Sequence, residues 1–179
     1  MANCCDSKVT LLGDNSDLKR LFEKLKGKDS IGLNEYPSLF NGDTDYTNFD
    51  WGSKRQTFDE LDFTEEFGQD MYIYGYSDWN PAKGLWKEIS KEYNLEIVLE
   101  YSEMGNNIGG VVSYVNGEVR YEDDMSYYGY LYRNDEYGFW SQIEMDLEDE
   151  SLEDLIVSLG DVYEWLSDEE RERISSFVN

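Results

Sequence analysis

The dipeptide Asn116-Gly117 stands between two runs of residues that alternate in polarity, 108–115 and 118–121. Asn-Gly favours a two-residue type I′ turn, because both residues tolerate a positive φ angle, and this turn joins neighbouring antiparallel strands. The sequence therefore predicts a β-hairpin, and with it an antiparallel sheet, in this part of the chain.

Further alternating segments indicate more strands. Alternation predicts strands around residues 9–11, 71–76 and 95–102. A short strand is also expected near 51–57, at the end of a long irregular excursion over 28–56 that isolated aromatic side chains hold in place.

Two amphipathic helices lie between these strands. Apolar residues spaced by three and four positions predict helices over 18–25 and 85–93, with an N-cap within 14–16 for the first and at Asn80-Pro81 for the second. Two helices that alternate with strands of an antiparallel sheet indicate an α+β fold of the ferredoxin-like type. We expect this domain to occupy residues 1–121.

The remaining residues, 122–179, are expected to form an acidic, Tyr-rich extension with C-terminal helices. Five tyrosines precede Phe139 and Trp140 and suggest one more strand or hairpin: Tyr127, Tyr128, Tyr130, Tyr132 and Tyr137. Beyond them, Ser151 is a predicted N-cap, and Ser167 with Glu170 is a predicted capping box. The tail is therefore expected to be helical.

Two groups of tyrosines could either fill the core or contact a partner. Tyr72, Tyr74 and Tyr76 fall on one side of a predicted strand, and we expect them to pack a sheet face rather than to bind. The group that begins at Tyr127 is interleaved with acidic residues, as in protein interfaces where aromatic anchors lie among charges. Core and interface are equal alternatives for this second group.

Acidic side chains dominate the charge of the chain, which has 40 Asp and Glu against 15 Lys and Arg and a net charge of −25. The surplus is regional: residues 1–30 hold 6 basic and 5 acidic side chains, residues 31–120 hold 6 and 17, and residues 121–179 hold 3 and 18. Because self-repulsion opposes a compact state, this regional surplus favours an interaction surface. The alternative is a role in solubility or salt tolerance alone, which should have acidified all three regions.

Several classes of function are disfavoured by the residues present. The chain has no His, which removes the commonest general base and the His metal ligands. Carboxylate pairs occur, but 40 acidic residues produce such pairs by chance, so a carboxylate-based enzyme is not expected. Segment 41–48 resembles the start of a calcium loop but lacks the Gly and the bidentate Glu that an EF-hand requires. We expect no enzyme, no cofactor and no metal site.

Cys4 and Cys5 are adjacent, and no further Cys or His accompanies them. They are expected to be buried or half-buried thiols at the start of a strand. No apolar run reaches the roughly 18 residues of a membrane span, and the N-terminus has no apolar signal core. We therefore expect a cytoplasmic protein.

Four short segments resemble a known family. They are residues 1–13, Asp50-Trp51-Gly52-Ser53-Lys54, Trp79-Asn80-Pro81, and Tyr101-Ser102-Glu103-Met104-Gly105 followed by a Gly-rich hairpin. Together they resemble the YubB-like proteins of plasmids and phages, which carry a ferredoxin-like domain, over about residues 1–121. Arg55 departs from the family, in which an aromatic residue follows the Lys. The resemblance implies a mobile-element origin, where small acidic inhibitors of host nucleases are a frequent class, and it brings no catalytic motif.

The charge and the resemblance lead to one preferred function. We expect an anti-defence protein that occupies the nucleic-acid-binding groove of a host nuclease, a CRISPR effector before a restriction enzyme, with carboxylates in place of phosphates. Its partner would be a basic nucleic-acid-binding protein, without direct binding of nucleic acid or membrane. The alternative is a passive acidic binding module or chaperone for basic proteins.

The expected binding surface lies after residue 121. It consists of Glu122, Asp123, Asp124, Tyr128, Tyr130, Asp135, Glu136, Glu144, Asp146, Glu148, Asp149 and Glu150. A secondary acidic patch is expected at Asp59, Glu60, Asp62, Glu65 and Glu66. Reversing the charges of 122–124, or those of 148–150, is expected to leave folding intact while it weakens the partner complex.

Overall fold

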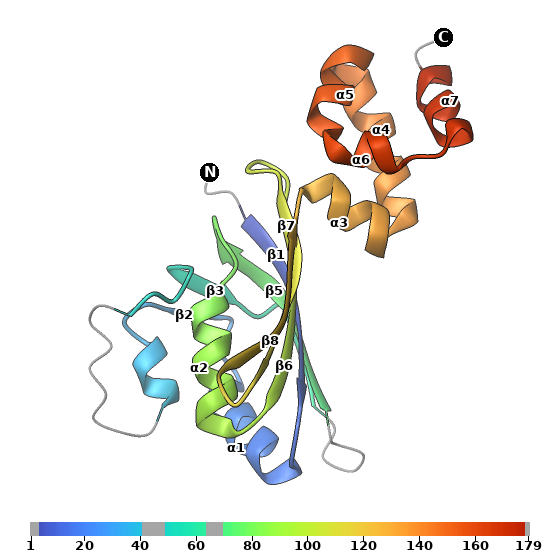
Figure 1. Cartoon of the computed structure of the whole chain (residues 1–179). Coiled ribbons are helices and arrows are strands. Elements are labelled where there is room, and N and C mark those ends of the chain that lie inside the picture. Colours follow the sequence, from blue (N-terminus) through green and yellow to red (C-terminus); the bar gives the residue numbers. More distant parts are fainter. Residues whose placement is uncertain (1–3, 41–48, 64–69, 178–179) are drawn as a thin grey trace. The chain divides into compact units, whose positions relative to one another are not determined.

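The computed structural model describes residues 4–40, 49–63 and 70–177. The chain divides into two compact units, Met1–Asp124 and Met125–Asn179. The first unit is built on a sheet and the second on helices (Figure 1).

The sheet of the first unit has the strand order β2-β3-β5-β1-β6-β7-β8 among the described residues, and β4 pairs with β5 along the edge that β3 also uses. Its strands are β1 (Cys4–Leu12), β2 (Ser30–Gly32), β3 (Arg55–Thr57), β4 (Glu60–Asp62), β5 (Asp70–Asp78), β6 (Glu96–Glu103), β7 (Ile108–Val115) and β8 (Glu118–Met125). The central pairs β1–β5, β1–β6 and β6–β7 are antiparallel.

Two helices, α1 (Asn15–Leu25) and α2 (Lys83–Tyr93), pack on the same face of this sheet (Figure 1). Strand residues alternate accordingly, so that every second residue of β1, β5 and β6 is buried beneath the helices. The core includes Val9, Leu11, Leu18, Leu21, Leu25, Met71, Ile73, Leu85, Trp86, Ile89, Tyr93, Ile97 and Leu99. The predicted α+β fold, with an antiparallel sheet and two covering helices, is confirmed.

The predicted hairpin is also confirmed. Asn116 and Gly117 join β7 to β8 with φ angles of 54° and 78°, and positive φ at both positions is what a type I′ turn requires.

The long excursion is held by buried aromatic rings, as expected, and it contains more regular structure than the sequence indicated. It includes β2 and a 3₁₀ helix, η1 (Tyr36–Leu39), before the predicted short strand β3. Tyr36, Phe40 and Trp51 are buried together. The calcium-like segment 41–48 lies outside the described residues.

Two local expectations in the first unit were wrong. Helix α2 begins at Lys83, and Asn80 does not cap it; instead the N–H of Asn80 donates to the carbonyl of Asp78 (2.8 Å) in a turn. Cys4 is exposed whereas Cys5 is buried, because successive residues of a strand point to opposite faces.

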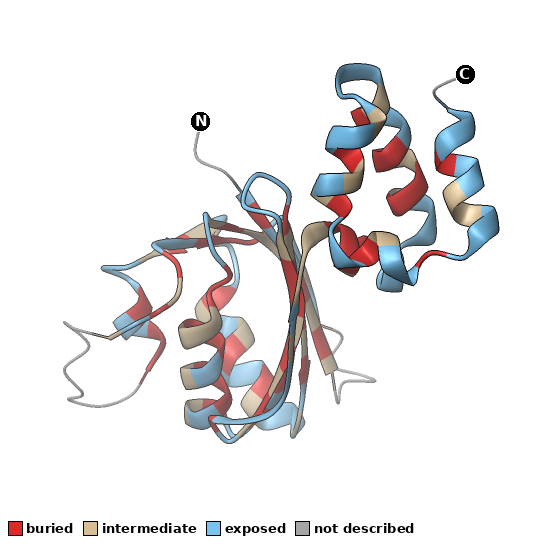
Figure 2. Ribbon diagram, turned by 45° about the horizontal axis from the view of Figure 1, so that its top comes forward, coloured by how far each residue is buried: buried red, intermediate tan, exposed pale blue. Residues whose placement is uncertain are grey.

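The second unit consists of α3 (Tyr127–Asn134), α4 (Glu136–Asp149), α5 (Leu152–Leu159), α6 (Asp161–Trp165) and α7 (Asp168–Ser176). These helices turn their buried residues toward one another (Figure 2). The second core is formed by Tyr128, Leu131, Phe139, Trp140, Ile143, Leu155, Leu159, Val162, Leu166 and Ile174.

The strand or hairpin expected around Tyr127–Trp140 was wrong, because α3 and α4 occupy this segment. The hydroxyl of Ser126 accepts from the N–H of Gly129 (3.0 Å), and the carboxylate of Asp135 accepts from the N–H of Gly138 (2.9 Å). Each bond satisfies a donor in a first helical turn. The predicted N-cap at Ser151 and the predicted capping box of Ser167 and Glu170 are both confirmed.

None of the described helices has the length and apolar character that crossing a membrane requires.

Candidate protein-binding surface

Two of the residues predicted to bind a partner lie inside the helical unit. Tyr128 and Asp146 are buried. The hydroxyl of Tyr128 donates to Asp146 Oδ2 (2.6 Å), and Gln142 Nε2 donates to Asp146 Oδ1 (2.9 Å). A buried carboxylate needs such donors. The expectation that Tyr128 and Asp146 contact a partner was therefore wrong, because both side chains serve the core.

The remaining predicted residues of the helical unit occupy different environments. Tyr130 packs against the helical core together with Tyr127 and Tyr132, so most of this tyrosine group belongs to the core, whereas Tyr137 is 85% exposed. Asp135 is exposed but caps α4. Five further predicted acids are exposed and available for contact: Glu136, Glu144, Glu148, Asp149 and Glu150.

The acidic triplet at the end of β8 is divided between two environments. Lys83 Nζ donates to Glu122 Oε1 (2.9 Å) and to Asp124 Oδ1 (2.7 Å), and its ammonium lies 4.9 Å from the centre of the Tyr101 ring. The hydroxyl of Tyr101 also donates to Asp124. Asp123 instead accepts from the hydroxyl of Tyr121 (3.0 Å).

This cluster shifts the pKa values of its members. Burial raises the pKa of Asp124, but the hydrogen bonds from Lys83 and Tyr101 outweigh it and hold that pKa below its usual range. Burial lowers the pKa of Lys83, and its bonds to Asp124, Tyr101 and Glu122 outweigh that effect and raise it. Glu122 and Asp124 therefore neutralise Lys83 at the start of α2. Reversing the triplet would break a structural cluster, against the expectation that folding stays intact.

The secondary acidic patch is placed beside the tyrosines of β5. Strand β4 pairs with β5 so that Glu60 lies opposite Tyr74 and Asp62 lies opposite Tyr72. Asp59, Glu60 and Asp62 are exposed, and Glu65 and Glu66 lie outside the described residues. Acidic and aromatic side chains thus share one surface.

That surface is the side of the sheet that no helix of the first unit covers within the described residues (Figure 1). We call it the open face. Burial and register assign to it Cys4, Asp6, Lys8, Thr10 and Leu12 of β1, Glu60 and Asp62 of β4, Asp70, Tyr72, Tyr74, Tyr76 and Asp78 of β5, and Glu96, Val98, Glu100 and Ser102 of β6.

The tyrosines of the open face are not packed under helices. Met71 and Ile73 fill the covered face instead, while Tyr74 is 39% exposed and Tyr72 and Tyr76 are half-buried. The hydroxyl of Tyr72 donates to Asp70 Oδ2 (2.9 Å). The three rings therefore form an accessible row, contrary to the expectation that they serve packing.

Both basic residues near this row are already neutralised. Lys8 lies between Tyr74 and Glu100 in the register and pairs with Glu100 at 2.9 Å. Arg55 pairs with Asp78 at 2.8 Å and lies 5.9 Å from the centre of the Tyr76 ring. Partial burial and the nearby charge of Asp59 raise the pKa of Asp6. The open face thus carries surplus negative charge that a cationic partner would relieve.

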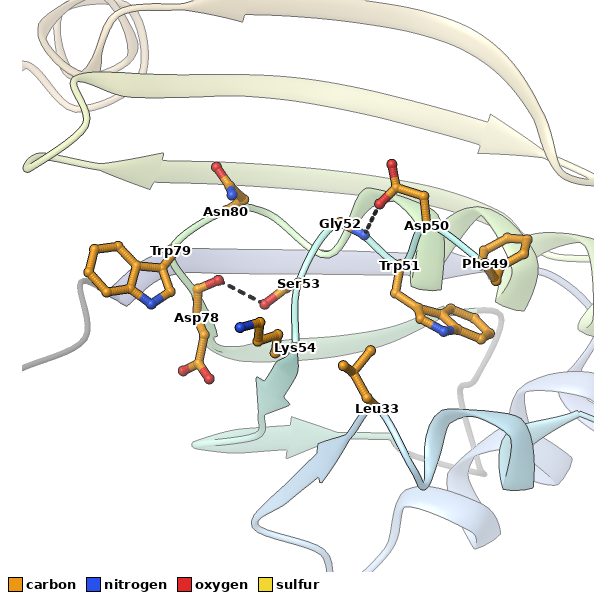
Figure 3. Close-up of a pocket in the computed structure, with 10 residues that line it drawn as sticks. All are labelled: Leu33, Phe49, Asp50, Trp51, Gly52, Ser53, Lys54, Asp78, Trp79 and Asn80. Carbon is orange, nitrogen blue, oxygen red and sulfur yellow. Dashed lines mark hydrogen bonds between the residues drawn. The ribbon is translucent and has the colours of Figure 1, made fainter. Parts of the chain in front are cut away.

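A pocket of about 390 Å³ lies at one end of β5 (Figure 3). Residues 49–54, residues 78–80 and Leu33 line it. Two of the four segments that carry the family resemblance, Asp50–Lys54 and the one that begins at Trp79, therefore meet around one cavity.

Hydrogen bonds and a close backbone approach hold the 49–54 loop against the end of β5 and against α2. The N–H of Gly52 donates to Asp50 Oδ1 (3.0 Å), the hydroxyl of Ser53 donates to the carbonyl of Asp78 (3.0 Å), and the N–H of Leu85 donates to the carbonyl of Trp51 (3.3 Å). A Cβ atom on Gly84 would lie 1.9 Å from the carbonyl oxygen of Asp50. Only Gly permits this approach.

Trp79 forms an exposed wall of the pocket and has an unusual backbone. Its φ angle is 66° and its side chain is 46% exposed, and a bulky residue at positive φ is rare and strained. Asn106 Nδ2 donates to the Trp79 carbonyl (3.4 Å). Glu103, in the third segment of the resemblance, accepts from the N–H groups of Gly105 and Asn106 and thereby fixes that turn.

A family model, described as the ferredoxin-like domain in Api92-like protein, matches residues 47–138. The chain belongs to this family. The match includes the pocket loop, β5, α2, the β7–β8 hairpin and the start of the helical unit. The ferredoxin-like fold class expected from the sequence is therefore confirmed. No curated protein and no solved structure matches the chain.

The described residues include no group of three or more His, Cys, Asp or Glu side chains that could hold a metal ion. Neither the pocket nor the acid–tyrosine register of the open face was predicted from the sequence. The alternation of Tyr72, Tyr74 and Tyr76 was a usable signal for an accessible row. No local signal gave the pairing of β4 with β5, since no turn dipeptide links them.

Proposed function

We propose that this Api92-like chain is an acidic anti-defence protein of a phage or plasmid, which inhibits a host nuclease by occupying its nucleic-acid-binding groove. A CRISPR effector is the preferred target and a restriction enzyme the second. The observation that carries the proposal is the open face, where Glu60 and Asp62 stand opposite Tyr74 and Tyr72 on an uncovered sheet.

The spacing of the open face suits a groove that binds nucleic acid. Residues on one face of a strand recur every ~6.7 Å, which is about twice the ~3.4 Å by which successive phosphates of one DNA strand advance along the helix axis. Tyrosine rings between the carboxylates add favourable contacts for Arg side chains. Complementary potential would mainly speed and orient the association.

The exposed acids of the helical unit support the second candidate, a passive acidic module that binds many basic proteins weakly. Glu144, Glu148, Asp149 and Glu150 lie on α4 and just after its end, and the exposed tyrosine of that helix is Tyr137 alone among the described residues. Such a surface favours weak binding that depends on charge alone.

A pair of matched variants separates the two candidates. Glu60→Lys with Asp62→Lys changes the open face, and Glu148→Lys with Glu150→Lys changes the helical unit by the same net charge; all four side chains are exposed. Each protein is added to a guide-loaded single-chain CRISPR effector and to a restriction enzyme, and DNA cleavage is measured at low and high DNA concentration.

We expect the natural chain to inhibit cleavage, and excess DNA to relieve this inhibition. Inhibition by the open-face variant should be at least tenfold weaker. Inhibition by the helical-unit variant should differ from that of the natural chain by less than threefold. Equal losses in both variants would support the passive module. Inhibition that excess DNA does not relieve would exclude mimicry.

A further inference from the structure

We infer that the pocket beside the open face receives an aromatic side chain of the partner, from a segment that also carries basic residues. This inference rests on the proposed function, because it assigns the anchor of the same partner. An acidic surface alone would select basic side chains of the partner and not an aromatic ring.

The pocket has accessible apolar walls beside its polar residues. Trp79 is 46% exposed and Leu33 is 43% exposed, while Phe49 is partly buried against the Trp51 ring at 4.4 Å between centroids. A volume of about 390 Å³ lies at the small end of the roughly 300–1,000 Å³ of ligand sites. Such a space accommodates an aromatic ring, and large aromatic anchors in pockets carry much of the binding free energy of protein interfaces.

One of the two carboxylates that line the pocket is paired with a cation, and the other accepts a backbone hydrogen bond. Asp78 is paired with Arg55 at 2.8 Å, and Asp50 Oδ1 accepts from the N–H of Gly52. Lys54 and Arg55 balance the charges of Asp50 and Asp78, unlike the carboxylates of Glu60 and Asp62 on the open face. The pocket therefore attracts a cation less than the open face does, and its volume suits an apolar group.

Lys54 favours binding of an aromatic ring over an aliphatic side chain in the pocket. This exposed residue lines the pocket and forms no ion pair within the part of the chain that the structure describes. An ammonium near the face of a ring is attracted to it, whereas it repels Lys and Arg. The pocket therefore selects a ring where the open face selects a cation.

Asp78 connects the two sites. It ends the alternating row of β5 that begins at Asp70, and it also lines the pocket. Tyr74 and Asp78 are four positions apart, a distance of ~13 Å along the strand. A single extended segment of the partner can thus place a basic side chain over Tyr74 and a ring beside Trp79.

The strained backbone keeps the wall in place before binding. A bulky residue at positive φ is strained and persists only where its surroundings fix it. At Trp79 the Asn106 side chain and the turn of Ser77 and Asn80 hold this conformation. A wall held in its bound position reduces the ordering cost of association.

The test uses two capped peptides, Lys-Lys-Gly-Gly-Phe and Lys-Lys-Gly-Gly-Ala, titrated into the full chain while the indole N–H signals are followed by NMR. The Trp79 signal is assigned with the Trp79→Phe variant. We expect the Phe peptide to shift the Trp79 signal and to bind at least fivefold tighter than the Ala peptide.

Matched variants locate the effect. Leu33→Asp places a charge at the rim of the pocket, and Val119→Asp makes the same change at a residue of β8 that is 48% exposed and belongs neither to the pocket nor to the residues assigned to the open face. Leu33→Asp should abolish the preference for Phe, and Val119→Asp should keep it. Thermal melting confirms that both variants fold.

Equal affinity for both peptides without a shift of the Trp79 signal would overturn the inference and leave the proposed function standing, provided that cleavage is still inhibited. A shift of Trp79 by the Phe peptide that Leu33→Asp abolishes, in a chain that inhibits neither nuclease, would support the pocket and refute the proposed function.

Discussion

Asp124 shows how a residue that looks like part of a binding surface can serve stability. It accepts from Lys83 and from Tyr101, and its pKa lies below its usual range because these bonds outweigh partial burial. A carboxyl whose pKa is lower in the folded chain than in the unfolded chain stabilises the fold at pH values above its unfolded pKa, near 3.9. That contribution is lost as the pH falls through the folded value.

We therefore predict that Asp124→Asn lowers the free energy of unfolding by roughly 0.5–1 kcal/mol at pH 7, a modest value because the side chain of Asp124 is 62% exposed. The difference should persist at pH 5 and shrink below pH 4. Urea unfolding at pH 7, 5 and 3 measures it. Glu118→Gln, on the same exposed strand, serves as the control and should change little; a difference that grows at low pH would contradict the assignment.

Tyr128 and Asp146 likewise serve stability in the helical unit. Both were predicted to lie at a partner interface because the surrounding residues are acidic and aromatic. Composition does not distinguish a carboxylate that faces solvent from one that a Tyr hydroxyl and a Gln amide satisfy in the core. Only the helical spacing of 146 relative to 142 and 143, which are both buried, could have indicated this.

At the scale of elements, the sequence predicted those strands and helices whose signals are local. The Asn116-Gly117 turn and the caps at Ser151 and Ser167 depend on neighbouring residues and were predicted correctly. The segment after Tyr127 was misassigned because alternate tyrosines imitate the period of a strand. The caps at Ser126 and Asp135 were the overlooked signal for α3 and α4.

The candidate site was less predictable, because it depends on contacts between segments that are not adjacent in the sequence. The open face requires the register of β4 on β5, and the pocket requires the 49–54 loop to reach the turn after β5. Neither contact leaves a periodic or turn signal in the sequence. The acidic patch at 59–62 was noticed, but its neighbours Tyr72 and Tyr74 could not be assigned to it.

A substitution at Gly84 tests the contact between the pocket loop and α2. An added Cβ would lie 1.9 Å from the carbonyl oxygen of Asp50, so we predict that Gly84→Ala costs about 1–3 kcal/mol and weakens the preference for the Phe peptide. Ala normally stabilises a helix relative to Gly by roughly 1 kcal/mol, so the sign of the change is diagnostic.

Thermal and urea unfolding measure the effect, with Gly32→Ala as the control. The nearest atom to a Cβ on Gly32 is the carbonyl oxygen of Lys54 at 3.9 Å, an ordinary contact, so this variant should be nearly neutral. A stabilised Gly84→Ala protein would show that the loop does not depend on close approach to α2.

At the scale of the whole molecule, a net charge of −25 opposes folding and promotes association with cations. Salt screens both effects, with a Debye length of about 10 Å at 0.1 M. We predict that raising NaCl from about 20 to 300 mM increases Tm by a few degrees while it weakens the partner complex.

Differential scanning fluorimetry and inhibition assays at the same salt concentrations measure these opposite trends. The two charge-reversal variants serve as internal controls, because each removes the same amount of negative charge and should show a smaller rise of Tm with salt. A Tm that falls as salt increases would mean that attractive ion pairs, such as those of Lys83, dominate over repulsion.

The two adjacent cysteines give the chain a built-in site for a single chemical label. Cys4 is exposed on the open face, while Cys5 is buried and its pKa is raised to about 12, first by burial and then by the charges of Asp6 and Glu103. Since the thiolate is the reactive form, a maleimide dye added to the folded protein attaches at Cys4 alone. The dye then stands at the residue paired with Asp78, between the tyrosine row and the pocket, and its emission reports occupancy of either site without any engineered residue.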